Sequence, residues 1–100
     1  MKARTLKPPS TWYVYLIECR DGSLYTGIAV DVAQRYAKHV AGTGARYTRS
    51  HPPLRLLGQC AYPDRSAASI AEYRIKQLTV RGKRALCDSW AASIGIPATQ

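Results

Sequence analysis

The sequence predicts an α+β domain with a three-stranded antiparallel sheet flanked by helices, in the element order ββαβαα. Three segments are rich in the aromatic and β-branched residues typical of strands: residues 12–19, 24–28 and 54–62. Helical spacing of apolar residues occurs at 32–40, 66–81 and 85–94. The 100 residues suffice for one domain with one modest core. We expect a mobile basic leader at 1–10, a domain at 11–94 and a tail at 95–100.

The first two strands form a hairpin whose register the strand pattern leaves open. Residues 12–19 (WYVYLIEC) are apolar on both faces, which is typical of a central strand covered on two sides. With a two-residue turn, Tyr25 lies on the face opposite Tyr15. With a three-residue turn that ends at Gly22 in the left-handed conformation, both tyrosines share one face. In that case Tyr15 lies opposite Gly27, and a hollow opens beside both phenols.

The first helix, residues 32–40, follows Asp31, which is a favourable N-cap residue. Its predicted buried side consists of Val32, Tyr36 and Val40. Arg35 and His39 are four residues apart and therefore neighbours on the predicted outward stripe. Two potential cations side by side repel each other, so we expect an anion to bind between them.

Glycines and prolines delimit the remaining elements. Residues 41–53 (AGTGARYTRSHPP) are typical of a loop. The helix at 66–81 is expected to stop at Gly82, because glycine is favoured just past a helix end. The last helix has one apolar stripe, made of Leu86, Trp90 and Ile94.

The charge distribution indicates a polyanionic partner. The net charge is +9, and the segment from Val32 to Pro63 contains no Asp or Glu. Such a run favours nucleic acid over a charge that serves solubility alone. The candidate phosphate contacts are Lys38, Arg46, Arg49 and Arg55. Tyr47, in the same segment, offers a ring on which an exposed base can stack.

Other classes of protein are disfavoured. The three cysteines have no C-x-x-C spacing, which argues against a zinc site. The first ten residues lack the apolar segment of a secretory signal, and no apolar run approaches the roughly 20 residues that span a bilayer. We expect a cytoplasmic protein with no membrane partner, and a monomer.

Several motifs resemble the GIY-YIG nuclease superfamily. They are VYL at 14–16, YTG at 25–27, Arg35, His39 and Glu72 in a later helix. The stretches DGSLYTGIA, GARYTR and AEYRIKQLT resemble its small stand-alone bacterial members of the YhbQ type (UPF0213). The resemblance covers most of the chain, from Trp12 to Leu86. The ten-residue spacings from Tyr15 to Tyr25 to Arg35 make the combination specific.

This resemblance implies a role for each matching residue. Tyr15 and Tyr25 would surround the water that attacks phosphorus, and Arg35 would bind the phosphate. His39 matches a position that relatives fill with His or Tyr. Glu72 matches the carboxylate that holds one Mg²⁺ or Mn²⁺ ion. Placing both tyrosines in one site selects the three-residue turn.

The same residues also have ordinary structural interpretations. The tyrosines suit a strand, and the two basic residues suit a solvated helix face. Glu72 precedes Lys76 by four residues, which is the spacing of a surface ion pair. Glu72 also lies on the stripe of Ala68 and Ile75, at the expected edge of the buried side. A lone carboxylate there is costly unless it is paired or metal-bound.

We therefore expect a metal-dependent DNA endonuclease that acts in repair or in the processing of single-stranded, flapped or branched DNA. RNA is the alternative nucleic acid. The chain departs from the family pattern at Tyr13-Val14-Tyr15, which lacks a glycine, and at Ala29, which replaces a hydroxyl residue. Two alternatives stay open: a nucleic-acid-binding module with the same fold and little catalysis, and a recruitment domain for another protein.

Overall fold

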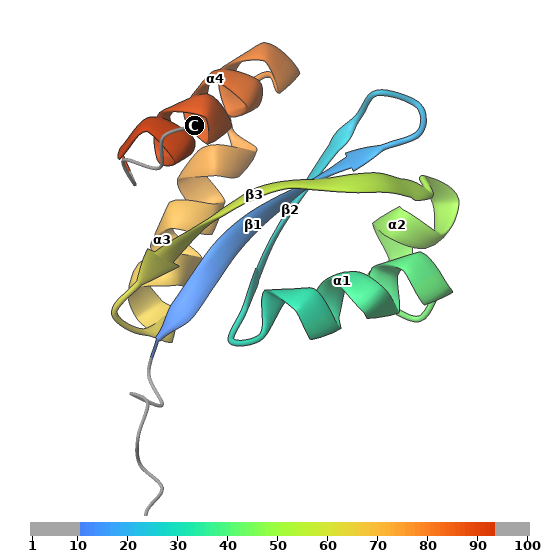
Figure 1. Ribbon diagram of the computed structural model, residues 1–100, viewed down its shortest axis with the longest axis horizontal. Coiled ribbons are helices and arrows are strands. Elements are labelled where there is room, and N and C mark those ends of the chain that lie inside the picture. Colours follow the sequence, from blue (N-terminus) through green and yellow to red (C-terminus); the bar gives the residue numbers. More distant parts are fainter. Residues whose placement is uncertain (1–10, 94–100) are drawn as a thin grey trace, which may run out of the picture.

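The structure is a computed structural model that describes residues 11–93, and it confirms the α+β fold (Figure 1). The predicted leader (1–10), the predicted tail (95–100) and residue 94 lie outside the described residues. The strands are β1 Trp12–Cys19, β2 Leu24–Ala29 and β3 Pro53–Tyr62. The helices are α1 Val32–Ala41, α2 Arg46–Ser50, α3 Arg65–Lys76 and α4 Val80–Ser93. None of these helices is long and apolar enough to cross a membrane.

Strand β1 is the centre of the antiparallel sheet, whose order is β2-β1-β3. Its side chains alternate between two clusters, because successive residues of a strand point to opposite faces. Val14 and Leu16 pack against α3 and α4, whereas Tyr15 and Ile17 pack toward α1. Figure 1 shows the two pairs of helices on opposite sides of the sheet. The prediction of a central strand covered on both faces is confirmed.

The hairpin has the three-residue turn, which confirms the register with both tyrosines on one face. Tyr15 lies opposite Gly27, and Tyr25 lies opposite Ile17. Gly22 has φ = 89°, in the left-handed region where a Cβ would be strained. The ring centroids of the two tyrosines are 6.3 Å apart.

Helix α1 begins as predicted but turns a different side to the core. The carboxylate of Asp31 accepts a hydrogen bond from the backbone N–H of Gln34 at 3.0 Å, as an N-cap does. The predicted outward position of His39 is wrong, because its side chain is 0% exposed. Val40, predicted to be buried, is 58% exposed. Burial of the imidazole costs little free energy, because both of its nitrogens have hydrogen-bond partners in the interior.

The segment predicted to be a loop, residues 41–53, contains helix α2. Its N-cap residue, Ala45, makes no side-chain capping bond, so the usual sequence signal of a helix start is missing. Within the helix, the hydroxyl of Thr48 donates a hydrogen bond to the carbonyl of Ala45 at 3.0 Å. Helix α2 directs Thr48 into the interior and leaves Arg46 and Arg49 exposed.

The last two helices exist as predicted, but the predicted boundary between them is wrong. Helix α3 ends at Lys76 and α4 begins at Val80, so Gly82 lies inside α4 rather than at a helix end. The hydroxyl of Thr79 accepts a hydrogen bond from the N–H of Gly82 at 3.0 Å, which is N-cap geometry. The last helix therefore starts earlier than predicted, and the tight turn brings the end of α3 close to the first turn of α4.

Candidate active site

Tyr15 and Gly27 form the floor of the candidate site. Tyr15 is 1% exposed, and its phenol lies directly over Gly27 on the neighbouring strand. A Cβ at Gly27 would lie 2.5 Å from the phenol oxygen of Tyr15 and 3.0 Å from Cε2 of Tyr25. The expected hollow beside Gly27 is thus filled by the phenol itself. Glycine is required here because two aromatic rings approach the backbone this closely.

A chain of hydrogen bonds runs from Tyr15 into α2. The phenol oxygen of Tyr15 lies 2.9 Å from Nε2 of His39, and Nδ1 of His39 lies 2.7 Å from the hydroxyl of Thr48. The hydroxyl of Thr48 donates its one hydrogen to the carbonyl of Ala45. It must therefore accept from Nδ1–H of His39, which leaves Nε2 as an acceptor. The network thus assigns the tautomer of His39, and Tyr15 is the donor to it.

Burial and neighbouring charges tune the two titratable members of this chain. Burial lowers the pKa of His39, and the positive charge of Arg35 lowers it further, so the imidazole is neutral. Burial, followed by the charge of Tyr25, raises the pKa of Tyr15 to about 12. Arg35 acts on the pKa of Tyr15 in the opposite direction, and the Glu72 carboxylate raises it. Tyr25, Arg35 and Glu72 thus act on the phenol of Tyr15, which His39 contacts directly.

Tyr25 connects this chain to the surface. Its ring centroid lies 5.1 Å from that of His39 and 6.0 Å from that of Tyr47. Tyr47 in turn stacks on His51 at 4.0 Å, and Nδ1 of His51 lies 2.9 Å from a carboxylate oxygen of Asp21. One face of the Tyr47 ring is therefore covered by His51 rather than open to a base. These ring contacts, together with the His51–Asp21 bond, connect the β1–β2 turn to α2.

Glu72 occupies the position that its spacing predicts. It lies on the side of α3 that carries the buried Ala68 and Ile75, and its side chain is 22% exposed. Its Oε2 lies 3.2 Å from the ammonium of Lys76, so the ordinary ion pair four residues apart exists as well. The structure thus shows the ion pair and the edge position of Glu72, and its role as a metal ligand stays a prediction.

Glu72 alone offers too few ligands for a metal ion. A metal site at Glu72 would therefore need further ligands from water and from the substrate phosphate. Within residues 11–93, no group of three or more His, Cys, Asp or Glu side chains could hold an ion. One carboxylate fits Mg²⁺, which keeps several waters and binds through one or two carboxylates plus substrate phosphate. We therefore expect weak binding of the ion by the protein alone.

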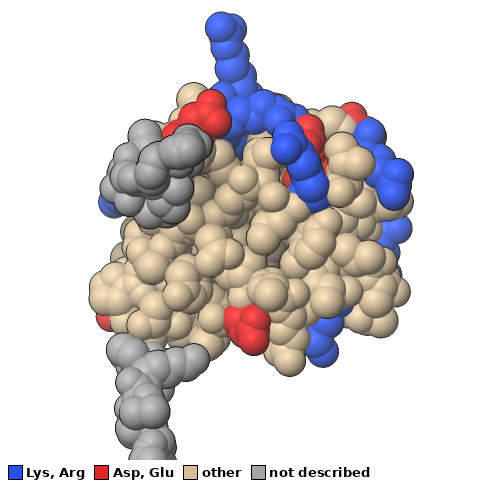
Figure 2. Space-filling view, in the orientation of Figure 1, with Lys and Arg blue, Asp and Glu red and all other residues tan. Residues whose placement is uncertain are grey.

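The predicted phosphate contacts divide between two surfaces. Lys38, Arg46 and Arg49 are exposed on α1 and α2. Figure 2 shows Lys and Arg side chains along the upper and right-hand rim of that view, with the centre almost free of them. Arg55 lies on the α3–α4 face, where its Nε donates to Glu18.

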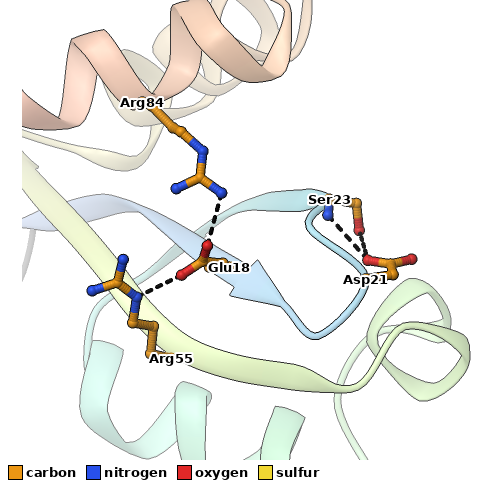
Figure 3. Close-up of polar contacts among 5 residues, drawn as sticks. All are labelled: Glu18, Asp21, Ser23, Arg55 and Arg84. Atoms are coloured by element: carbon orange, nitrogen blue, oxygen red, sulfur yellow. Dashed lines mark hydrogen bonds and ion pairs between the residues drawn. The ribbon is translucent and has the colours of Figure 1, made fainter.

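The carboxylate of Glu18 accepts hydrogen bonds from two arginines, as Figure 3 shows. Besides Arg55, its carboxylate accepts from Nη2 of Arg84 at 2.8 Å. Hydrogen bonds from Arg55 and then from Arg84 lower the pKa of the Glu18 carboxyl. The single charge of Glu18 is shared by two guanidinium groups, and the side chain of Arg55 is 62% exposed on the sheet face opposite α1 and α2. Its role as a phosphate contact stays a prediction.

Sequence reasoning missed Thr48 and Gly44 as parts of this site. Thr48 is 2% exposed, although it stands between basic residues in a stretch that predicts a loop. A Cβ at Gly44 would lie 2.6 Å from Nδ1 of His39, so only glycine leaves room for the imidazole. The available signal was the GARYT stretch itself, in which a small residue precedes a hydroxyl residue. No periodicity marks either position.

Comparison with known proteins places the chain within one family. The family model of the GIY-YIG catalytic domain matches residues 11–85. A UPF0213 protein of Cupriavidus pinatubonensis is 55% identical over 76 residues, which cover 76% of this chain and 84% of that protein. A UPF0213 protein of Xanthomonas campestris pv. campestris is 52% identical over 69 residues, or 69% of this chain and 68% of that protein. The solution NMR structure of a protein from E. faecalis is 30% identical with a TM-score of 0.58, over 87% of this chain and 93% of that one.

The fold, the site and the match over most of the chain define the class: the protein belongs to the GIY-YIG nuclease superfamily. Membership in a nuclease family implies that it binds nucleic acid. Within this class the chain belongs to the UPF0213 proteins, with which it shares about half of its aligned residues.

Proposed function

We propose that the protein is a metal-dependent endonuclease that hydrolyses phosphodiester bonds of DNA. The observation that carries the proposal is the buried chain Tyr15–His39–Thr48, with Arg35 and Glu72 near the same phenol. Phosphodiester hydrolysis needs a proton acceptor, a cation on the phosphoryl oxygens and help for the leaving oxygen. These groups supply the first two, and membership in the family supports the class of reaction.

The proton acceptor in this proposal is the Tyr15–His39 pair rather than a phenolate. A tyrosine with a pKa of about 12 keeps its proton at neutral pH and is a poor base by itself. Tyr15 can instead pass its own proton to Nε2 of His39 while its oxygen takes a proton from the attacking water. His39 then becomes a cation held by Thr48, the new hydroxide–phosphorus bond forms, and the bond to the leaving oxygen breaks.

Arg35 and Glu72 complete the proposed site from opposite sides. The guanidinium of Arg35 always carries its charge and can bind two phosphate oxygens at once. Glu72 would hold one Mg²⁺ or Mn²⁺ ion, which supplies charge stabilisation to the phosphoryl and leaving oxygens when bound. Lys76, now at Glu72, would have to yield part of its contact to the ion.

We place the substrate among single-stranded, flapped or branched DNA, in repair or processing. No helix within residues 11–93 has the extended basic face of a major-groove reader, and the exposed cations of α1 and α2 suit backbone contacts. The second candidate function is a nucleic-acid-binding module with little catalysis. The ion pair of Glu72 with Lys76 favours it, since a paired carboxylate has less need of a metal.

A cleavage panel separates the two functions. Labelled single-stranded, duplex, flap and junction DNA are incubated with the protein and with Tyr15→Phe, in Mg²⁺, in Mn²⁺ and in EDTA. An endonuclease cuts at least one substrate in a metal-dependent manner, and Tyr15→Phe, which lacks the hydroxyl that relays the proton, cuts it far more slowly. Binding without cleavage of any substrate in either metal would establish the binding module instead.

A further inference from the structure

A pocket of about 510 Å³ adjoins the candidate active site at the edge of the sheet. Its walls come from the edge strand β2, from α2 and from the turn between α3 and α4. The residues that matter to the argument are Leu24, Tyr25, Thr26, Tyr47, Lys76 and Lys83. This size is ordinary for a site that takes a small organic ligand.

Thr26 is the feature of this pocket that points to a ligand. Thr26 lines the pocket and is 2% exposed, and its hydroxyl oxygen, itself buried, has no hydrogen-bond partner among the described residues. A buried hydroxyl without a partner destabilises the fold, and proteins seldom retain one. Val has nearly the same shape and would avoid this cost. A hydroxyl is useful here if a bound group supplies the missing partner.

Two ammonium groups give the pocket its charge. Lys76 closes α3 and Lys83 lies in the first turns of α4, so the turn between the helices places both at one wall. Burial, and then the charge of Lys76, lower the pKa of Lys83, as expected where two cations converge in a partly closed space. An anion would relieve this repulsion.

The pocket is continuous with the candidate active site through two residues. Tyr25 lines the pocket and also stands next to Tyr15. Lys76 lines it and also contacts Glu72 at 3.2 Å. A DNA strand whose phosphate lies at Arg35 and Glu72 would therefore bring its adjacent nucleotide to this pocket.

We infer that the pocket binds one unpaired nucleotide next to the phosphate that is cut. Its phosphate lies at Lys76 and Lys83, its base packs against Leu24 and the edges of the tyrosine rings, and a polar atom of the base meets the hydroxyl of Thr26. This inference rests on the proposed nuclease function and names the part of the substrate that the site recognises. A free phosphate would leave the apolar wall and the hydroxyl unused.

The nucleotide must be unpaired for geometric reasons. In a duplex the base is stacked on both faces and its pairing edge is occupied, so it can reach a side pocket only after it leaves the stack. Single strands, flaps and frayed ends expose such a base at little cost. The pocket thus favours these substrates over continuous duplex.

The test measures preference for a base, apart from cleavage. Fluorescein-labelled dT8 and an octamer of the same length with abasic sugars are titrated in EDTA with the wild type, Thr26→Val, Lys83→Gln and Arg81→Gln. Arg81 is the matched control, because it is exposed on the same helix, two residues away and on a different side. The melting temperature of each protein is recorded in parallel.

The expected pattern is specific. Wild type binds dT8 at least about fivefold more tightly than the abasic octamer, as base contacts in single-strand sites do. Thr26→Val reduces this preference about two- to tenfold and raises the melting temperature, since the isolated hydroxyl is gone. Lys83→Gln weakens binding of both octamers more than Arg81→Gln does. Unlabelled duplex of the same length competes poorly with dT8.

Four results would overturn the inference: no preference in the wild type, an unchanged preference in Thr26→Val, equal losses in Lys83→Gln and Arg81→Gln, or full competition by the duplex. Since EDTA removes the metal, none of these depends on catalysis. A protein that prefers dT8 as expected but cuts nothing would refute the endonuclease and support the nucleotide pocket. A protein that cuts DNA without this preference would support the endonuclease and refute the nucleotide pocket.

Discussion

The two faces of β1 are built for different purposes, although neighbouring residues supply them. On the α3–α4 face, Val14 and Leu16 lie among apolar side chains. On the α1–α2 face, Tyr15 bonds to His39, which bonds to Thr48, and all three are buried. An apolar cluster contributes in proportion to the area it buries. A buried polar chain depends on every partner being present, because a lost partner leaves a costly unsatisfied group.

This contrast predicts that stability and activity can be changed separately. Substitutions in the apolar cluster should lower the free energy of unfolding while folded molecules keep their activity. Substitutions in the polar chain or at Glu72 should impair activity by more than their effect on folding explains. The following variants test this separation, from the largest expected effect to the smallest.

Glu72→Gln should reduce cleavage by at least about 100-fold, because the anchor of an ion that supplies several kcal/mol of charge stabilisation is lost. DNA affinity should hold or rise, since a negative charge that faces phosphate has gone. The free energy of unfolding should change by only about 0.5 kcal/mol, the value of a partly exposed ion pair. Cleavage and binding of the best substrate are measured beside Asp88→Asn, which removes an exposed carboxylate of α4. Equal cleavage by Glu72→Gln and wild type would remove Glu72 from the site.

Leu16→Ala tests the other face. The side chain is fully buried in the apolar cluster, so its truncation should lower the free energy of unfolding by about 2–5 kcal/mol. At low temperature, where the variant is still folded, cleavage per folded molecule should stay within about twofold of wild type, because Leu16 points away from the site. Urea unfolding and cleavage at 10 °C measure both quantities. A large loss of activity in fully folded protein would show that the two faces are coupled.

Thr48→Val and Thr48→Ser separate geometry from packing on the polar face. Valine removes the acceptor of Nδ1–H of His39, so the imidazole loses the partner that fixes its tautomer. We expect cleavage to fall about tenfold or more, within the range of a general acid–base contribution. Serine keeps the hydroxyl and should retain most activity. The ¹⁵N shifts of His39 report its tautomer directly: Nδ1–H in wild type and Thr48→Ser, and a changed pattern in Thr48→Val. Wild-type shifts of the Nε2–H tautomer would refute the assignment.

Strand alternation predicted the sheet, because it is a local signal. It left the hairpin register open, and the resemblance to the GIY-YIG superfamily selected the register in which Tyr15 and Tyr25 share one face. Sequence reasoning failed for His39, Thr48 and the break after Lys76. A buried histidine looks the same in sequence as a solvated one, since its partners come from α2, which has no capping signal. The break depends on the Thr79 cap, which a pattern of apolar residues does not show. Polar burial thus needs the tertiary structure, because the sequence does not show which partners a polar side chain meets.

Arg46→Ala with Arg49→Ala tests whether the α1–α2 side also binds the DNA backbone. Both residues are exposed, so the double variant should fold normally and weaken binding about equally across DNA sequences. The slope of log affinity against log salt should flatten by roughly one unit per lost phosphate contact. Arg74→Ala with Arg81→Ala removes the same charge from exposed positions of α3 and α4 and serves as the control. If both double variants change the slope equally, the effect reflects net charge and not a binding surface.

The smallest expected effect is a dependence of stability on pH that comes from His39. Burial lowers its pKa in the folded state, whereas the unfolded chain has the ordinary value near 6.5. As pH falls below 6.5, the unfolded chain therefore binds a proton that the native protein does not, and the free energy of unfolding decreases. The protein has two histidines, so His51→Gln leaves His39 alone to titrate in this range. Urea unfolding of His51→Gln at pH 7.5 and 5.5 should show lower stability at pH 5.5, and the NMR titration of the His39 ring should have its midpoint below 6.5. Stability that rises on acidification would mean that native His39 is a cation. In that state Nε2 carries a proton and cannot accept from Tyr15, so the polar face of β1 could not relay a proton in the way proposed.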